Sequence, residues 1–100
     1  MAPDFDSAVD IVKHSIARLT KRFSASDLDD TKVLKNVDID DDQHLTELKL
    51  ETFKSVQDSD QATWNFQQFM VLQSYSVSST IGDAANDIVD AAGVARKPKD

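Results

Sequence analysis

Residues 4–23, DFDSAVDIVKHSIARLTKRF, carry the clearest structural pattern in the chain. Apolar side chains recur there at alternating spacings of four and three residues, which aligns them along one side of an α-helix. Acidic residues lie near the start of the segment and basic residues near its end, an order that complements the helix dipole. The pattern predicts a helix over 4–23 with an apolar seam of Phe5, Val9, Val12, Ile16, Leu19 and Phe23.

The rest of the chain also favours helices. Two glycines and two prolines in 100 residues are too few for the turns of a sandwich or barrel of short strands. A second helix is predicted over 44–57, with a strand as the alternative because residues 45–53 alternate in part. The sequence therefore predicts an all-α fold, either a helical hairpin or a three-helix arrangement.

A long C-terminal helix is predicted over 61–92, ending before Gly93. Its second half has an apolar seam from Val77 to Ala95. Together the three helices make a single domain over residues 1–95, followed by a flexible tail at 96–100.

Residues 61–82 contain no charged side chain, although 29% of the chain is charged. Polar residues fill about half of this segment, which is costly in hydrocarbon, so membrane insertion is not expected. Uncharged residues on all sides of a helix favour contact with other protein, and aromatic side chains dominate such surfaces. The alternative is ordinary core packing. The predicted interface residues are Trp64, Phe66, Phe69, Met70, Tyr75, Val77, Ile81 and Ile88.

The acidity of the protein is concentrated in its middle third. Residues 26–60 carry eleven acidic and four basic side chains, and the whole chain has a net charge of −7. This charge disfavours nucleic-acid binding, because a phosphate backbone would repel it. Within this part of the chain, residues 26–43 are predicted to form an acidic connector between helices.

One stretch of the connector, residues 36–47, resembles a calcium-binding loop in its spacing. Asn36, Asp38, Asp40 and Glu47 stand at positions 1, 3, 5 and 12, where such a loop places its oxygen ligands. Asp41 occupies position 6, where the sharp turn requires glycine. The expectation is a solvated acidic turn without a cofactor, with weak Ca²⁺ binding as the alternative.

Enzyme activity is not expected from these residues. The chain has no cysteine and no glycine-rich phosphate loop, and its two histidines, His14 and His44, are far apart in sequence. The N-terminus is acidic and lacks the pattern of a cleaved secretory signal. The sequence leaves the localisation open between the cytoplasm and export without such a signal.

Residues 58–91, DSDQATWNFQQFMVLQSYSVSSTIGDAANDIVDA, resemble the C-terminal helix of small type III secretion needle and inner-rod subunits. Those proteins have a polar turn before a long helix that opens with an aromatic–Gln–x–x–Met-like run, here residues 65–70. The resemblance implies a non-enzymatic subunit that polymerises through its helices and needs a chaperone to stay soluble.

Three hypotheses follow for the function. The first is a self-assembling subunit of a secretion-type structure, which makes homo-oligomers. The second is an acidic adaptor or inhibitor that binds a single protein partner. The third is a weakly calcium-binding helix–loop–helix module.

Overall fold

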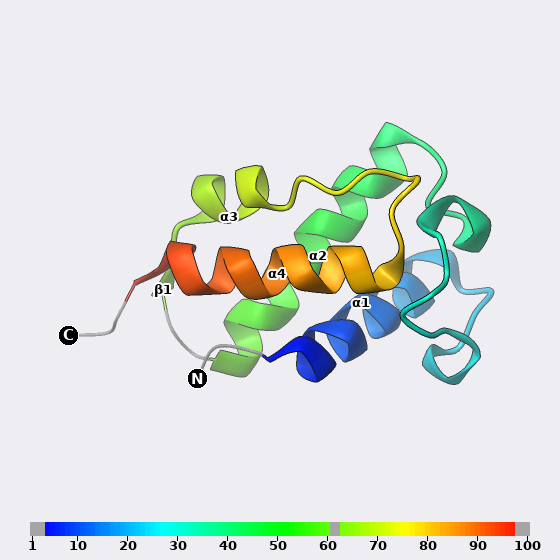
Figure 1. Cartoon of the computed structure of the whole chain (residues 1–100), viewed down its shortest axis with the longest axis horizontal. Helices are drawn as coiled ribbons and strands as arrows, with labels where there is room; N and C mark the ends of the chain where they lie inside the picture. The colour runs from blue at the N-terminus through cyan, green and yellow to red at the C-terminus, as the bar shows by residue number, and fades with distance from the viewer. Residues whose placement is uncertain (1–3, 61–62, 98–100) are drawn as a thin grey trace.

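A computed structural model describes residues 4–60 and 63–97 of the chain, with side chains for 4–58 and 65–95. The all-α fold predicted from the sequence is confirmed (Figure 1). The described residues contain four helices, α1 (Phe5–Thr20), α2 (Asp42–Asp60), α3 (Phe66–Leu72) and α4 (Ile81–Ala95). Two short 3₁₀ turns, η1 (Ala25–Asp27) and η2 (Leu34–Val37), lie between α1 and α2. Two-residue strands, β1 (Thr63–Trp64) and β2 (Arg96–Lys97), form an antiparallel pair.

Helix α1 begins and ends at residues that satisfy its free backbone groups. The Asp4 carboxylate caps the helix by accepting a hydrogen bond from the Ser7 N–H at 2.8 Å. At the other end Lys21 is left-handed, with φ 56°, and its N–H donates to the Ala17 carbonyl. This left-handed residue ends the helix three residues before the end predicted from the sequence, so Phe23 lies beyond it. The centre of the apolar seam, Val12 and Ile16, is fully buried.

The single helix predicted over 61–92 is wrong, because the structure has two helices separated by residues 73–80. A capping box begins the second one. The Asp83 N–H donates to the Thr80 hydroxyl, and the Thr80 N–H donates to the Asp83 carboxylate, both at 3.1 Å. The predicted stop at Gly93 is also wrong, since α4 continues through that residue to Ala95.

Helix α4 runs through the middle of the molecule, with α1 on one side and α3 on the other (Figure 1). The apolar seam predicted from Val77 to Ala95 is confirmed for the part that lies within α4, which begins at Ile81. Most of its buried side chains are alanine, which lets neighbouring helices approach closely. The buried residues of α4 are Ile81, Ala84, Ala85, Ile88, Ala91, Ala92 and Ala95.

Residues 73–80 run back along the molecule and join the connector between α1 and α2 (Figure 1). Val33 and Thr80 form an isolated antiparallel bridge. On either side of it, the Leu34 N–H donates to the Ser79 carbonyl and the Gly82 N–H donates to the Asp30 carbonyl, both at 2.9 Å. A Cβ on Gly82 would stand 3.1 Å from that Asp30 oxygen, so the close approach favours glycine. These bonds tie the acidic connector to the body of the fold.

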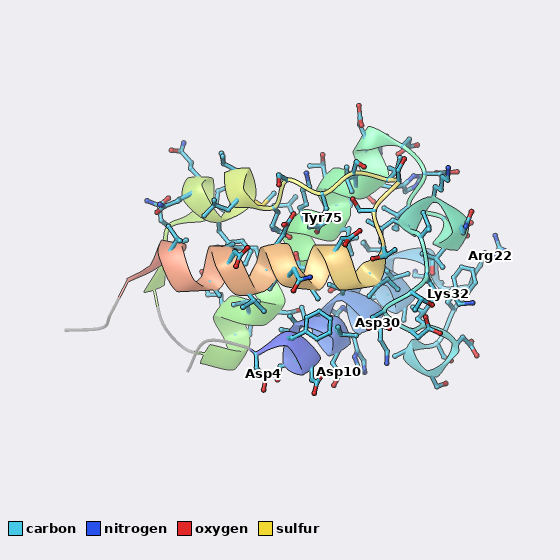
Figure 2. The ribbon with its side chains drawn as sticks, viewed as in Figure 1. Asp4, Asp10, Arg22, Asp30, Lys32 and Tyr75 are labelled. Atoms are coloured by element: carbon cyan, nitrogen blue, oxygen red, sulfur yellow. The ribbon has the colours of Figure 1, made fainter. Side chains whose placement is uncertain are left out.

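A buried polar group attaches residues 73–80 to α2. The Gln73 side chain is 1% exposed. Its Oε1 accepts hydrogen bonds from the Thr52 hydroxyl at 2.7 Å and from the Tyr75 hydroxyl at 2.8 Å. Its Nε2 donates to the Lys49 carbonyl at 3.0 Å. Because buried polar groups are costly without partners, this network favours one position of the chain after α3. Tyr75 lies near the centre of the molecule in Figure 2.

Partial burial raises the pKa of Asp87 on α4, and the neighbouring Asp90 raises it further. A folded-state pKa above the unfolded value means that the charged carboxylate destabilises the fold as pH rises through that pKa. We therefore expect Asp87→Asn to raise the melting temperature at pH 7 and to change it less at pH 3, measured by circular dichroism. Asp30→Asn, an exposed change of the same charge, serves as control. An Asp87→Asn variant that melts below the wild type at pH 7 would contradict this expectation.

Candidate functional site

The acidic turn, residues 38–42, leads into α2 and presents successive carboxylates at the surface. Asp38 is left-handed, with φ 68°, and reverses the chain at the end of η2. Ile39 is then 1% exposed and anchors the turn in the core. Asp40, Asp41 and Asp42 follow, and all three are exposed. One buried residue therefore fixes a turn whose other side chains face solvent.

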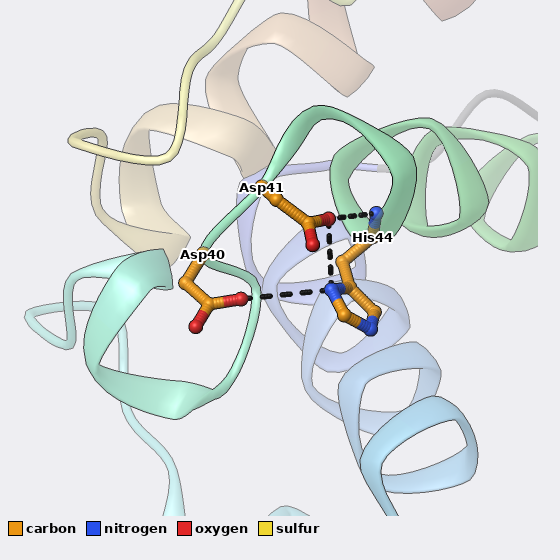
Figure 3. Close-up of side chains that lie close together, drawn as sticks. All are labelled: Asp40, Asp41 and His44. Atoms are coloured by element: carbon orange, nitrogen blue, oxygen red, sulfur yellow. Dashed lines mark hydrogen bonds and ion pairs between the residues drawn. The ribbon is translucent and has the colours of Figure 1, made fainter.

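Asp41 and His44 organise the first turn of α2. The Asp41 carboxylate accepts a hydrogen bond from the His44 N–H at 2.8 Å, which caps the helix. The His44 Nδ1 lies 2.8 Å from Asp41 Oδ1 and 3.5 Å from Asp40 Oδ1 (Figure 3). Within residues 4–58 and 65–95, these three side chains form the one group of three or more histidines and carboxylates whose ligand atoms all lie within 4.8 Å of one another.

The four residues in calcium-loop spacing take different places. Asn36 is exposed in η2, and Asp38 Oδ2 accepts a hydrogen bond from Arg22 Nη1 at 2.8 Å. Glu47 lies one turn into α2 and accepts from Gln43 Nε2 at 3.5 Å. Of the predicted ligands, Asp40 alone belongs to the group with Asp41 and His44. Asp41 stands where a calcium loop requires glycine, and its carboxylate caps α2.

A hollow of about 280 Å³ opens beside the acidic turn, between the end of α1 and the start of α2. Leu19 and Ile39 supply its apolar part, while Asp38, Asp40 and His44 supply polar groups. Thr20 completes the lining. The Asp38 and Asp40 side chains are 41% and 62% exposed.

A second hollow, of about 440 Å³, lies beside η2, which supplies two of its lining residues. Its lining residues are Phe23, Asp27, Leu28, Lys32, Asn36 and Val37. Figure 2 places Arg22, Asp30 and Lys32 at this same end of the molecule. Both acidic and basic side chains occur around this second hollow, whereas the rim of the first carries carboxylates and one histidine.

The predicted interface residues divide by burial. Phe69, Tyr75, Ile81 and Ile88 are buried inside the chain itself. Met70 and Val77 pack against that core and are partly buried. Phe66 is 46% exposed, with its ring edge on Phe53 at a centroid distance of 5.0 Å. The Trp64 side chain lies outside the described residues.

Several carboxylates in the exposed turns work as local caps. Hydrogen bonds from Ser7, Ser24 and Thr31 hold the pKa values of Asp4, Asp27 and Asp29, respectively, below their usual range. Burial raises the pKa of the Tyr75 hydroxyl, so it stays protonated and donates to Gln73. These groups stabilise turns and the core.

The sequence placed His44 beside the acidic run at the entry to a helix, but it did not indicate the specific contacts of His44 with Asp40 and Asp41, or the hollow. An Asp three residues before His44, at a helix start, is a capping signal that was available from the sequence. The hollow had no such signal, because its lining comes from two segments that are distant in sequence, the end of α1 and the start of α2.

In the described ranges, no helix has both the length and the apolar character needed to span a bilayer. Comparison of the chain with protein-family models, with curated proteins and with solved structures finds no match.

Proposed function

We propose that this chain is a non-enzymatic binding module that presents the acidic turn at the start of α2 to a basic surface of a partner protein. The observation that carries the proposal is the run of exposed carboxylates at Asp40, Asp41 and Asp42 on a turn fixed by Ile39. Rigid, clustered charge on a small fold gives electrostatic complementarity, which governs partner choice and association rate.

The net charge of the whole protein also favours a positively charged partner. A net charge of −7 repels acidic proteins and nucleic acids and attracts basic proteins. The nearby cation Arg22 is already paired with Asp38. Asp40 and Asp42 therefore offer carboxylates that an incoming lysine or arginine can approach from solvent.

Charge reversal of the acidic turn tests this function. We expect an Asp40→Lys, Asp42→Lys variant to lose partner proteins that the wild type retains at about 50 mM salt, since exposed charge pairs are strongly screened at higher salt. The measurement is affinity capture from cell extract at two ionic strengths. The control variant, Asp6→Lys with Asp10→Lys, reverses two exposed charges on α1.

The two variants give different outcomes under the proposal. A partner lost from the acidic-turn variant and kept by the α1 variant supports the acidic turn as the binding site. Equal retention by both variants, or salt-independent capture, would contradict it. Melting temperatures of both variants establish that each is folded.

The second candidate is self-association, as the resemblance to needle and inner-rod subunits implies. The specific observation is that α3 carries no charge and exposes Phe66 at 46% and Val71 at 77%. Two copies of a chain with net charge −7 repel each other, and an uncharged helix is the surface where this repulsion is least.

Sedimentation velocity over a range of concentrations tests self-association. We expect larger species at about 1 mM than at 10 μM, and we expect Val71→Asp to abolish them, because a charge at the contact would be desolvated. Thr46→Asp, an exposed change on α2, is the control. A strict monomer at all concentrations would exclude this candidate.

A further inference from the structure

We propose that the hollow between α1 and α2 binds one arginine side chain of the partner protein. This inference rests on the proposed function, because it names the group by which a basic partner is recognised. The hollow combines an apolar part, Leu19 and Ile39, with carboxylates of Asp38 and Asp40 at its edge. Those two features match the two parts of an arginine, an aliphatic stem and a cationic head.

The hollow is small enough to be filled by a single side chain. Its volume of about 280 Å³ lies at the lower end of the roughly 300–1,000 Å³ of typical small-molecule sites. Its position also suits a protein partner, because Asp40 joins the hollow to the exposed carboxylates of the acidic turn. A partner would then place one arginine in the hollow and its neighbouring basic side chains against the exposed carboxylates of the acidic turn.

Arginine is favoured over lysine by the chemistry of the rim. A guanidinium is planar, offers five donors and pairs with carboxylates through two parallel hydrogen bonds. The chain itself contains an arginine–carboxylate pair made through one hydrogen bond, since Arg22 Nη1 lies 2.8 Å from Asp38 Oδ2. Arg22 already pairs with Asp38 at 2.8 Å, whereas the contact of Asp40 with His44 Nδ1 is longer, at 3.5 Å. Because the Asp40 side chain is also 62% exposed, Asp40 is the main carboxylate for the incoming group.

Peptide binding followed by methyl NMR tests the proposal. The probe is a peptide of glycine, serine and glutamine with two lysines and one central residue, either arginine, lysine or citrulline. The chain has five isoleucines, and Ile39 alone among them lines the hollow. We expect the arginine peptide to shift the Ile39 methyl signal and to leave the other isoleucine signals in place. Citrulline, which keeps the shape and removes the charge, should weaken binding about tenfold.

Three matched variants separate this inference from the proposed function. Asp40→Asn neutralises a charge at the hollow, Asp42→Asn neutralises one on the same turn outside it, and Asp6→Asn neutralises one on α1. Circular dichroism establishes that each is folded. We expect Asp40→Asn to weaken the arginine peptide about tenfold, Asp42→Asn about twofold and Asp6→Asn hardly at all.

Each other result overturns a defined part of the proposal. Equal losses for Asp40→Asn and Asp42→Asn, with an unmoved Ile39 signal, would overturn the hollow and leave the acidic turn as the binding site. Equal binding affinities of the arginine and citrulline peptides would also overturn the assignment of the hollow as an arginine site. Binding that depends as much on Asp6 as on Asp40, or no binding at low salt, would overturn the proposed function as well.

Discussion

Replacing Phe69 with alanine is expected to lower the free energy of unfolding by about 3–5 kcal/mol. Phe69 is fully buried, and its ring stacks edge-on against Phe53 at a centroid distance of 5.2 Å. It is the one fully buried side chain of α3, a helix of seven residues. A helix that short is not stable by itself in water, so its position depends on this anchor.

Urea denaturation followed by circular dichroism measures the effect. The matched control is Val71→Ala on the same helix, which removes a side chain that is 77% exposed. We expect the control to stay within about 0.5 kcal/mol of the wild type. A small domain has only about 5–15 kcal/mol of stability, so the Phe69→Ala variant should be close to unfolding. A loss below about 1 kcal/mol would mean that α3 contributes little to the fold.

Replacing Gln73 with leucine is expected to cost about 2–3 kcal/mol, because the change deletes the centre of a buried polar network. Leucine fills much of the space but cannot accept from the Thr52 and Tyr75 hydroxyls or donate to the Lys49 carbonyl. The Tyr75 hydroxyl would then be buried without this acceptor, which is the expensive situation for a polar group. The loss should be larger than the volume change alone explains.

Two further variants test that explanation by urea denaturation. Tyr75→Phe removes a single donor and should cost about 1 kcal/mol. Combining Gln73→Leu with Thr52→Val and Tyr75→Phe should recover part of the loss, since apolar groups then replace the polar partners together. If Gln73→Leu costs no more than Tyr75→Phe, the network does not hold residues 73–80 against α2 as we describe.

The network and the proposed binding site are connected through the backbone. Gln73 fixes the start of the 73–80 segment on α2, and the end of that segment is bonded to the connector through Ser79 and Thr80. The same connector continues through η2 into the acidic turn. The core contacts that set the path of residues 73–80 thus also support the turn that presents the carboxylates.

The sequence by itself determined the helical class and the centre of two helices. In α1 and α4, apolar side chains follow the helical period, and the centre of each seam is buried: Val12 and Ile16 in α1, and Ile81, Ala84 and Ile88 in α4. Phe5, at the start of the α1 seam, is 37% exposed. Local periodicity is sufficient there because each helix has one side facing the core. The exposure of the acidic residues in the connector was likewise predicted, since charged residues seldom enter a core without partners.

Only the tertiary structure decided that two helices, α3 and α4, stand where the sequence predicts one. Residues 73–80 have no strong breaker, and the run of serines there is compatible with a helix or a turn. The break between the two helices is set by hydrogen-bond partners that are distant in sequence. Gln73 is satisfied by α2, and the backbone after Ser76 is satisfied by the connector. The Thr80–Asp83 capping box was present in the sequence, but its use requires the chain to leave α3 first.

The candidate site depends even more on the tertiary structure. The exposed aspartates are visible in the sequence, but the hollow beside them combines Leu19 with Asp40 and His44, from the two ends of a connector of about twenty residues. Periodicity and spacing describe which residues are neighbours along one helix, and they do not show which distant segments come into contact. The sequence therefore determined the charge of this surface, and the packing of α1 against α2 determined its shape.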